Sequence, residues 1–158
     1  MKQFLSLLIS IFIVLSLPLS LAAEGIQQGK CPQERKTKKA PRVFHQLKNP
    51  IIKTDKHLSE AKLIFEKTAR PLQCVICHGK HGNGIGDPDF ASTPAARNFT
   101  CKKTMEEISD GQLFWVIQNG SAGTSMPQFK DLDDKSIWKL IIYIRNFSKT
   151  FSLSDSRV

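Results

Sequence analysis

Two cysteines and a histidine stand close together at Cys74, Cys77 and His78, in the order Cys-Val-Ile-Cys-His. Two thiols separated by two residues, with a histidine directly after the second, have the spacing that attaches c-type haem. The thiols add to the two vinyl groups of the porphyrin, so their separation must match the vinyl spacing. His78 would then lie against one face of the ring, where a neutral imidazole nitrogen binds iron. The motif predicts one haem c, bound covalently through Cys74 and Cys77, with His78 as an axial ligand.

The same residue types occur in Cys/His zinc sites and in redox dithiols. A zinc ribbon needs a second pair of closely spaced cysteines. The other two cysteines of the chain, Cys31 and Cys101, stand alone and far apart. The sequence therefore favours haem and leaves the zinc site and the dithiol as alternatives.

Haem iron needs a sixth ligand on the face opposite His78, and a methionine thioether is one of the few side-chain groups that suit it. Besides the initiating residue, the chain has Met105, at the start of a short predicted helix, and Met126, in a loop followed by proline. We predict that Met126 is the second axial ligand. Its alternative role is core packing, and His45, folded back from the N-terminal region, is a competing ligand.

The chain begins with a segment typical of export. Lys2 is followed by an uncharged run at residues 4–17, and Ala22 and Ala23 are small residues that offer a cleavage site. We expect residues 1–23 to be a secretory signal peptide and the mature protein to be periplasmic. A retained membrane anchor is the alternative, because the run is nearly long enough to span a bilayer. Membrane contact is expected only in that case.

Much of the positive charge, a formal +9 for the whole chain, lies in residues 24–56. This stretch has little hydrophobic periodicity and contains three prolines, so we interpret it as an extended basic arm. Export makes nucleic-acid binding improbable. The arm would either pack on the domain surface or form a docking strip for an acidic redox partner.

Cys31 lies in this arm and Cys101 in the domain. In an oxidising compartment, two cysteines left over after haem attachment suggest a disulfide. It would tie the arm to the segment after Thr100. The alternatives are an intermolecular bridge, two free thiols, or a thiolate that replaces Met126 on iron.

The patterns after residue 57 are helical. Residues 104–107 and 109–112 both have the form of a capping box, and the second would open a helix that ends at Gly120. Asp133 or Asp134 would cap a last helix. Apolar stripes are expected at Leu58, Ala61, Phe65, Thr68 and Leu72, and at Ile137, Leu140, Ile141, Ile144 and Phe147. No alternating strand pattern competes, so we expect an all-α domain whose long loops a haem would organise.

The chain from about Leu58 to Phe147 resembles the small single-haem class I cytochromes c. The matching segments occur in the family's order and are Cys-His-Gly at 77–79, Gly-Asn-Gly-Ile-Gly-Asp-Pro at 82–88, Pro-Ala-Ala-Arg-Asn-Phe-Thr at 94–100, Asp-Gly-Gln-Leu-Phe-Trp at 110–115 and Gly-Thr-Ser-Met-Pro at 123–127. The resemblance implies a cytochrome c fold with three to five helices wrapped around one covalently attached haem. It covers a domain at 57–149, with the arm at 24–56 before it and a tail at 150–158 after it.

Met126 occupies the position where this family carries its axial methionine. The resemblance also implies that Pro88 turns its backbone carbonyl toward the ring N–H of His78, which would fix the tautomer and strengthen the ligand.

Other residues are candidates for the cofactor pocket. Arg97 and Trp115 carry donors that would meet the haem propionates, although each has a surface or core role as its alternative. The apolar wall that keeps water from iron is predicted to contain Phe99, Leu113, Phe114 and Ile117.

With both axial positions filled, the expected function is electron transfer to redox partner proteins, with no enzymatic reaction of its own. One alternative is a haem-bearing electron-transfer subunit of a periplasmic oxidoreductase complex. Another is a haem sensor or enzyme with a displaceable sixth ligand, for which the sequence supplies no convincing distal acid–base pair.

Overall fold

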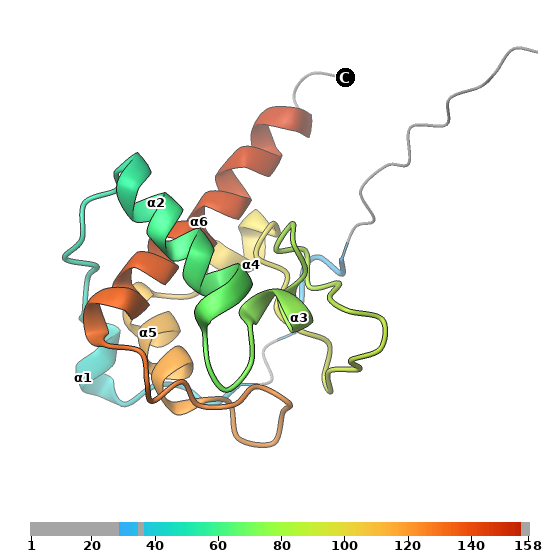
Figure 1. Ribbon diagram of the computed structural model, residues 1–158, viewed down its shortest axis with the longest axis horizontal. Coiled ribbons are helices and arrows are strands. Elements are labelled where there is room, and N and C mark those ends of the chain that lie inside the picture. The colour runs from blue at the N-terminus through green and yellow to red at the C-terminus, as the bar shows by residue number, and fades with distance from the viewer. Residues whose placement is uncertain (1–28, 35–36, 156–158) are drawn as a thin grey trace, which may run out of the picture.

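The computed structural model describes residues 29–34 and 37–155, which form helices joined by loops, with no strand among these residues (Figure 1). The elements are α1 (Arg42–His45), α2 (Asp55–Leu63), the π-helical turn η1 (Ile64–Thr68), α3 (Cys74–His78), α4 (Lys102–Glu106), α5 (Asp110–Asn119) and α6 (Asp134–Asp155). The predicted all-α class is confirmed. The expected signal peptide lies outside the described residues.

The described part of the expected 57–149 domain contains five helices when η1 is counted as the continuation of α2. α6 continues through Asp155, so the residues assigned to a tail at 150–158 begin as helix. Within the described segments, no helix is both long and apolar enough to cross a membrane.

Local capping fixes both ends of α5 and the start of α6. The Ser109 hydroxyl accepts a hydrogen bond from the Gln112 backbone N–H at 3.1 Å, and α5 ends before Gly120, whose φ of +73° is a conformation that favours glycine. The Asp133 carboxylate accepts from the Ser136 backbone N–H at 2.7 Å. These three sequence predictions are confirmed.

The capping box predicted at residues 104–107 is wrong. Thr104 lies inside α4, which begins at Lys102. Its hydroxyl accepts a hydrogen bond from the Gln33 backbone N–H at 3.1 Å and lies 3.2 Å from the Cys101 sulfur. A distant segment of the chain therefore uses the group that a local cap would have used.

α2 lies across α6, and together with η1 and α5 these elements enclose the core (Figure 1). The predicted apolar stripe of α6 is confirmed, and Ala61 and Phe65 are buried. Thr68 is exposed, because the helix widens into the π-turn at 64–68 and the spacing of the stripe no longer holds there.

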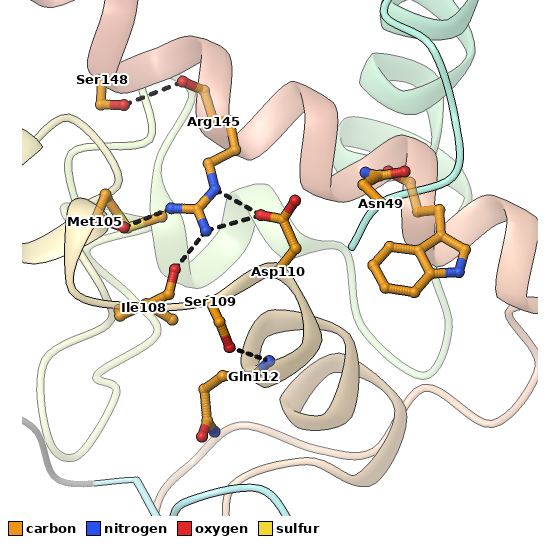
Figure 2. A network of polar contacts seen from close by, with 9 residues as sticks. Asn49, Met105, Ile108, Ser109, Asp110, Gln112, Arg145 and Ser148 are labelled. Atoms are coloured by element: carbon orange, nitrogen blue, oxygen red, sulfur yellow. Dashed lines mark hydrogen bonds and ion pairs between the residues drawn. The ribbon is translucent and has the colours of Figure 1, made fainter. Parts of the chain in front are cut away.

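Arg145 joins the middle of α6 to the start of α5 (Figure 2). Its guanidinium donates two hydrogen bonds to one carboxylate oxygen of Asp110, at 2.9 and 2.8 Å. It also donates to the backbone carbonyls of Met105 and Ile108. One side chain thus donates to backbone carbonyls between α4 and α5 and holds both helices against α6.

The described part of the arm is folded onto the domain and bonded to it by a disulfide between Cys31 and Cys101, with 5.5 Å between the Cα atoms. The preferred pairing of these cysteines is confirmed. The arm is less extended than expected, since it contains α1, where Phe44 stacks on Phe114 with 6.3 Å between ring centroids.

α1 approaches α5 so closely that only glycine fits beneath it. A Cβ atom at Gly111 would lie 1.7 Å from the carbonyl oxygen of Phe44. Next to it, the buried Gln112 side chain accepts from the Ala40 N–H at 2.7 Å and donates to the Lys38 carbonyl at 3.1 Å. The packing of the arm therefore depends on Gly111 and Gln112 of α5.

Candidate haem site

A cavity of about 300 Å³, lined mainly by apolar side chains, brings together Cys74, Cys77, His78 and Met126. The first three come from α3, and Met126 comes from the loop between α5 and α6. The CxxCH motif and the predicted methionine, which lie 48 residues apart between His78 and Met126, therefore meet at one cavity.

The loop that follows α3 holds this short helix in position. Gly79 has φ +74°, and a Cβ atom there would lie 2.1 Å from the Ile85 carbonyl oxygen. The Gly84 N–H donates to the His78 carbonyl at 3.0 Å, and the Asp87 N–H donates to the Ile76 carbonyl at 2.7 Å. The carbonyls at the end of α3 are thus satisfied by its own loop.

The thiols of Cys74 and Cys77 are not bonded to each other. Burial raises the pKa of Cys74 to about 12 and also raises that of Cys77. Both are neutral thiols at physiological pH, so neither places an unpaired charge in the apolar cavity.

The imidazole of His78 is oriented by a backbone carbonyl and by an aromatic ring. Its Nδ1 lies 3.0 Å from the Arg97 carbonyl oxygen, and its ring stacks on Phe99 with 4.4 Å between centroids. Burial lowers the pKa of His78 to about 4. A neutral ring that donates through Nδ1 keeps the lone pair of Nε2 for a metal.

The prediction that Pro88 accepts this hydrogen bond is wrong. Pro88 is exposed and does not line the cavity. Asp87 is fastened to Ile76 in α3, and the chain returns to the histidine ring only at Arg97. The Arg97 carbonyl belongs to the second half of this long loop, where the chain comes back to α3. The spacing of residues in the sequence does not reveal this path.

Backbone hydrogen bonds shape the loop that carries Met126. The Ser121 N–H donates to the Met126 carbonyl at 3.1 Å, and the Met126 N–H donates to the Thr124 hydroxyl at 3.2 Å. The Ser125 N–H donates to the Thr93 carbonyl at 3.0 Å, which links this loop to the one after α3. The two loops thus form one continuous border of the cavity.

The competing ligands lie elsewhere. Met105 is buried in the core, with 1% of its surface exposed. His45 is exposed, and its Nε2 lies 2.9 Å from the Ala40 carbonyl oxygen. Cys101 is consumed by the disulfide and cannot supply a thiolate.

The remaining predicted pocket residues divide into two groups. The cavity is lined by Arg97, Phe99, Leu113 and Ile117. Trp115 and Phe114 are not among its lining residues. Phe114 faces the core, where its ring lies 4.5 Å from that of Trp138. Neither Trp115 nor Phe114 lines the cavity, because Leu113, Val116 and Ile117 share one face of α5 and these two residues lie on the other side of the helix.

Sequence reasoning missed the contribution of the arm to the cavity. Lys30, Gln33, Glu34 and Thr37 all line it. The arm lacks the periodicity that marks buried segments, so only the neighbouring Cys31 gave a signal that this stretch returns to the domain.

The residues present fit a covalently attached haem. Two unpaired thiols, a neutral imidazole and a thioether meet at one apolar cavity, as thioether bonds and axial ligation require. A zinc site would need further ligands, and Cys31 and Cys101 are bonded to each other. In the segments that the structure covers, no group of three or more His, Cys, Asp or Glu residues could hold a metal ion.

An all-α domain with CxxCH at an apolar cavity has the arrangement of a c-type cytochrome. A family model described as cytochrome c oxidase, cbb3-type, subunit III, matches residues 58–144, more than half of the chain. The chain belongs to this family of class I-type cytochrome c domains, which carry covalently bound haem c. Its fold and family identify it as a c-type cytochrome.

A solved structure, the Kuenenia stuttgartiensis reducing HAO-like protein complex Kustc0457/Kustc0458, is also similar. The match has a TM-score of 0.50 and 27% sequence identity, and it covers 62% of this chain and 46% of that chain. The protein thus spans less than half the length of the chain it matches. No curated protein matches it.

Proposed function

We propose that the protein is an exported cytochrome with a single haem c ligated by His78 and Met126, and that it carries electrons between partner proteins. The observation that supports this proposal is the meeting of both thiols, the imidazole and the thioether at one apolar cavity. Haem c bound there would supply reversible one-electron transfer at iron.

Each residue of the site has a distinct task in this proposal. Cys74 and Cys77 would anchor the cofactor covalently, so that it cannot dissociate. Burial keeps His78 neutral and the Arg97 carbonyl orients its ring, while the Met126 loop would cover the opposite face of the haem. The apolar lining would limit water near the iron, and the Met126 thioether would fill the position that a haem enzyme leaves open.

Export rests on the sequence of residues 1–23 and is supported by the Cys31–Cys101 disulfide, because structural disulfides persist mainly in oxidising compartments. Haem attachment to thiols outside the cytoplasm agrees with this location.

A second candidate is an electron-transfer subunit of a larger oxidoreductase. It is favoured by the similarity to a chain of the reducing HAO-like complex, whose printed description names an assembly. In either case we propose that basic side chains of the arm, such as Lys38, Lys39 and Arg42, meet an acidic partner surface; all three are exposed.

The test is purification of the mature protein followed by acid–acetone extraction and redox titration. The haem should stay with the polypeptide, and the titration should follow one reversible one-electron step. A Cys74→Ala/Cys77→Ala variant should lose the covalent haem, whereas Cys31→Ser/Cys101→Ser should keep it. Recovery of zinc in place of iron would refute the proposal.

A further inference from the structure

We infer that Gln33, in the basic arm, is a positioning residue for the axial ligand His78 and acts through the backbone of Arg97. The inference rests on the proposed function, since it takes His78 as the iron ligand. Gln33 lies outside residues 58–144, the part of the chain that matches the family model. It would therefore be a device that this chain adds to the cytochrome domain.

The side-chain amide of Gln33 holds the chain on both sides of Arg97. Its Nε2 donates to the Ala96 carbonyl oxygen at 3.0 Å. Its Oε1 accepts from the Asn98 backbone N–H at 2.7 Å. One planar amide thus fixes the two peptide groups that flank Arg97, and the carbonyl of Arg97 is the group that lies 3.0 Å from Nδ1 of His78.

Gln33 is itself fixed by contacts of its own backbone. Its N–H donates to the Thr104 hydroxyl at 3.1 Å, and its carbonyl accepts from the Arg97 guanidinium at 3.4 Å. Two residues earlier, Cys31 is bonded to Cys101.

The buried Asn98 side chain adds a second connection, since its amide donates to the backbone carbonyls of Gly29 and Lys30 at 3.1 and 3.3 Å. The folded arm can therefore hold the Arg97 peptide in place.

The physical consequence concerns the strength of the His78 ligand. A carbonyl that accepts the Nδ1 proton increases the electron density of the imidazole, and such a ligand favours ferric over ferrous iron. If Gln33 no longer holds the neighbouring peptides, the Arg97 carbonyl can rotate away and the hydrogen bond weakens. Removal of the amide should then favour the ferrous state.

The experiment compares Gln33→Leu, which has a similar volume but no amide, with Gln46→Leu, which changes an exposed glutamine of the same arm. In Gln33→Leu the ferrous-to-ferric ratio at a fixed applied potential should rise about threefold, which corresponds to about 30 mV for a one-electron couple. Hydrogen exchange of the His78 ring N–H, followed by NMR in the ferrous protein, should accelerate at least about tenfold. Gln46→Leu should change neither quantity.

The variants are also compared by their unfolding midpoints, because a merely structural role would move stability and leave the potential and the ring N–H unchanged. If Gln33→Leu does not fold, Gln33→Met gives the same comparison with a more flexible apolar side chain. An unchanged potential and exchange rate in a folded Gln33 variant would overturn the inference. If the wild-type protein shows no histidine-ligated haem, the proposed function itself fails, so the two failures are distinguishable.

Discussion

The neutrality of His78 and the hydrogen bond at its Nδ1 belong together. A ring with its pKa lowered to about 4 by burial carries one proton at physiological pH. The Arg97 carbonyl requires that proton on Nδ1, since an oxygen there can only accept. Nε2 is consequently unprotonated, which is the state in which imidazole binds iron. The tautomer of one residue thus follows from the path of a loop.

Replacement of Met126 by alanine should lower the reduction potential, because a thioether ligand favours the ferrous state. We expect a shift of more than tenfold in the ferrous-to-ferric ratio, or more than about 59 mV. The weak near-infrared sulfur-to-iron band should disappear, and the iron should become accessible to carbon monoxide. A redox titration and absorption spectra measure these changes.

Met105→Leu is the matched control, since Met105 is buried in the core. It should retain the band and the potential. A wild-type protein that lacks the band and binds carbon monoxide readily would show that Met126 is not the ligand. That result would favour a haem sensor or enzyme over an electron carrier.

The site residues that could be predicted from the sequence are those whose side chains have a distinctive donor chemistry. Cys74, Cys77, His78 and Met126 are identified by donor chemistry, and all four line the cavity. Pro88 was assigned through its place in a loop, and it is exposed. A backbone carbonyl has no side-chain signature, so the path of the loop decides which one reaches the histidine.

At the scale of secondary structure, the helix boundaries that could be predicted are those fixed by hydrogen bonds between residues close together in the sequence. Ser109 caps the helix that it precedes, and Asp133 does the same for α6. Thr104 has the same capping chemistry but bonds to Gln33, which lies 71 residues away in the chain. The π-turn that follows Leu63 also left no local signal.

The disulfide between the arm and α4 should contribute substantially to stability. Cys31 and Cys101 are 70 residues apart, and in the chain-entropy model a loop of this size stabilises the fold by roughly 4 kcal/mol. Cys31→Ser/Cys101→Ser should lose about that free energy of unfolding, measured by denaturant titration of the haem-loaded protein. Wild-type protein treated with reductant should behave similarly, because thioether bonds resist reduction. A loss below about 1 kcal/mol would contradict the prediction and would mean that the disulfide constrains the unfolded chain far less than the chain-entropy model requires.

Arg145→Met should destabilise the fold by about 2–3 kcal/mol, because it removes charge-assisted hydrogen bonds to Asp110 and leaves two backbone carbonyls without their donor. A double-mutant cycle with Asp110→Asn, followed by thermal or denaturant unfolding, should give a coupling energy well above experimental error.

The control for this cycle is the exposed pair of Lys102 and Glu106, where both side chains are 65% exposed and 3.8 Å apart. Lys102→Met should change stability by less than about 0.5 kcal/mol. Equal effects at the two sites would show that Arg145 is an ordinary surface residue.

At the scale of the whole molecule, the arm serves two surfaces. Gln33 and Thr37 border the cavity, whereas Lys38, Lys39 and Arg42 are exposed and do not line it. The choice between a packed arm and a docking strip, which the sequence left open, is therefore not exclusive. One stretch of chain can close the cofactor cavity on its inner side and present positive charge on its outer side.

If the outer side of the arm guides docking, the rate of electron transfer to an acidic partner should fall as salt rises, because the screening length shortens to about 10 Å at 0.1 M. Neutralising Lys36, Lys38, Lys39 and Arg42 to glutamine should flatten this dependence. The potential should stay nearly unchanged, since the described members of this set lie outside the cavity lining and Lys30, which borders the cavity, is kept. Stopped-flow rates at several ionic strengths measure the slope.

The matched control neutralises the same number of exposed lysines on other elements, namely Lys67, Lys103, Lys130 and Lys135. Both variants lose the same net charge, so a general attraction between the two proteins would flatten both slopes equally. A local docking strip flattens the slope only when the arm is changed, because charges beyond a Debye length of the contact are screened. An unchanged slope in the arm variant would make the arm purely structural and would direct the search for the partner to the exposed edge of the cavity.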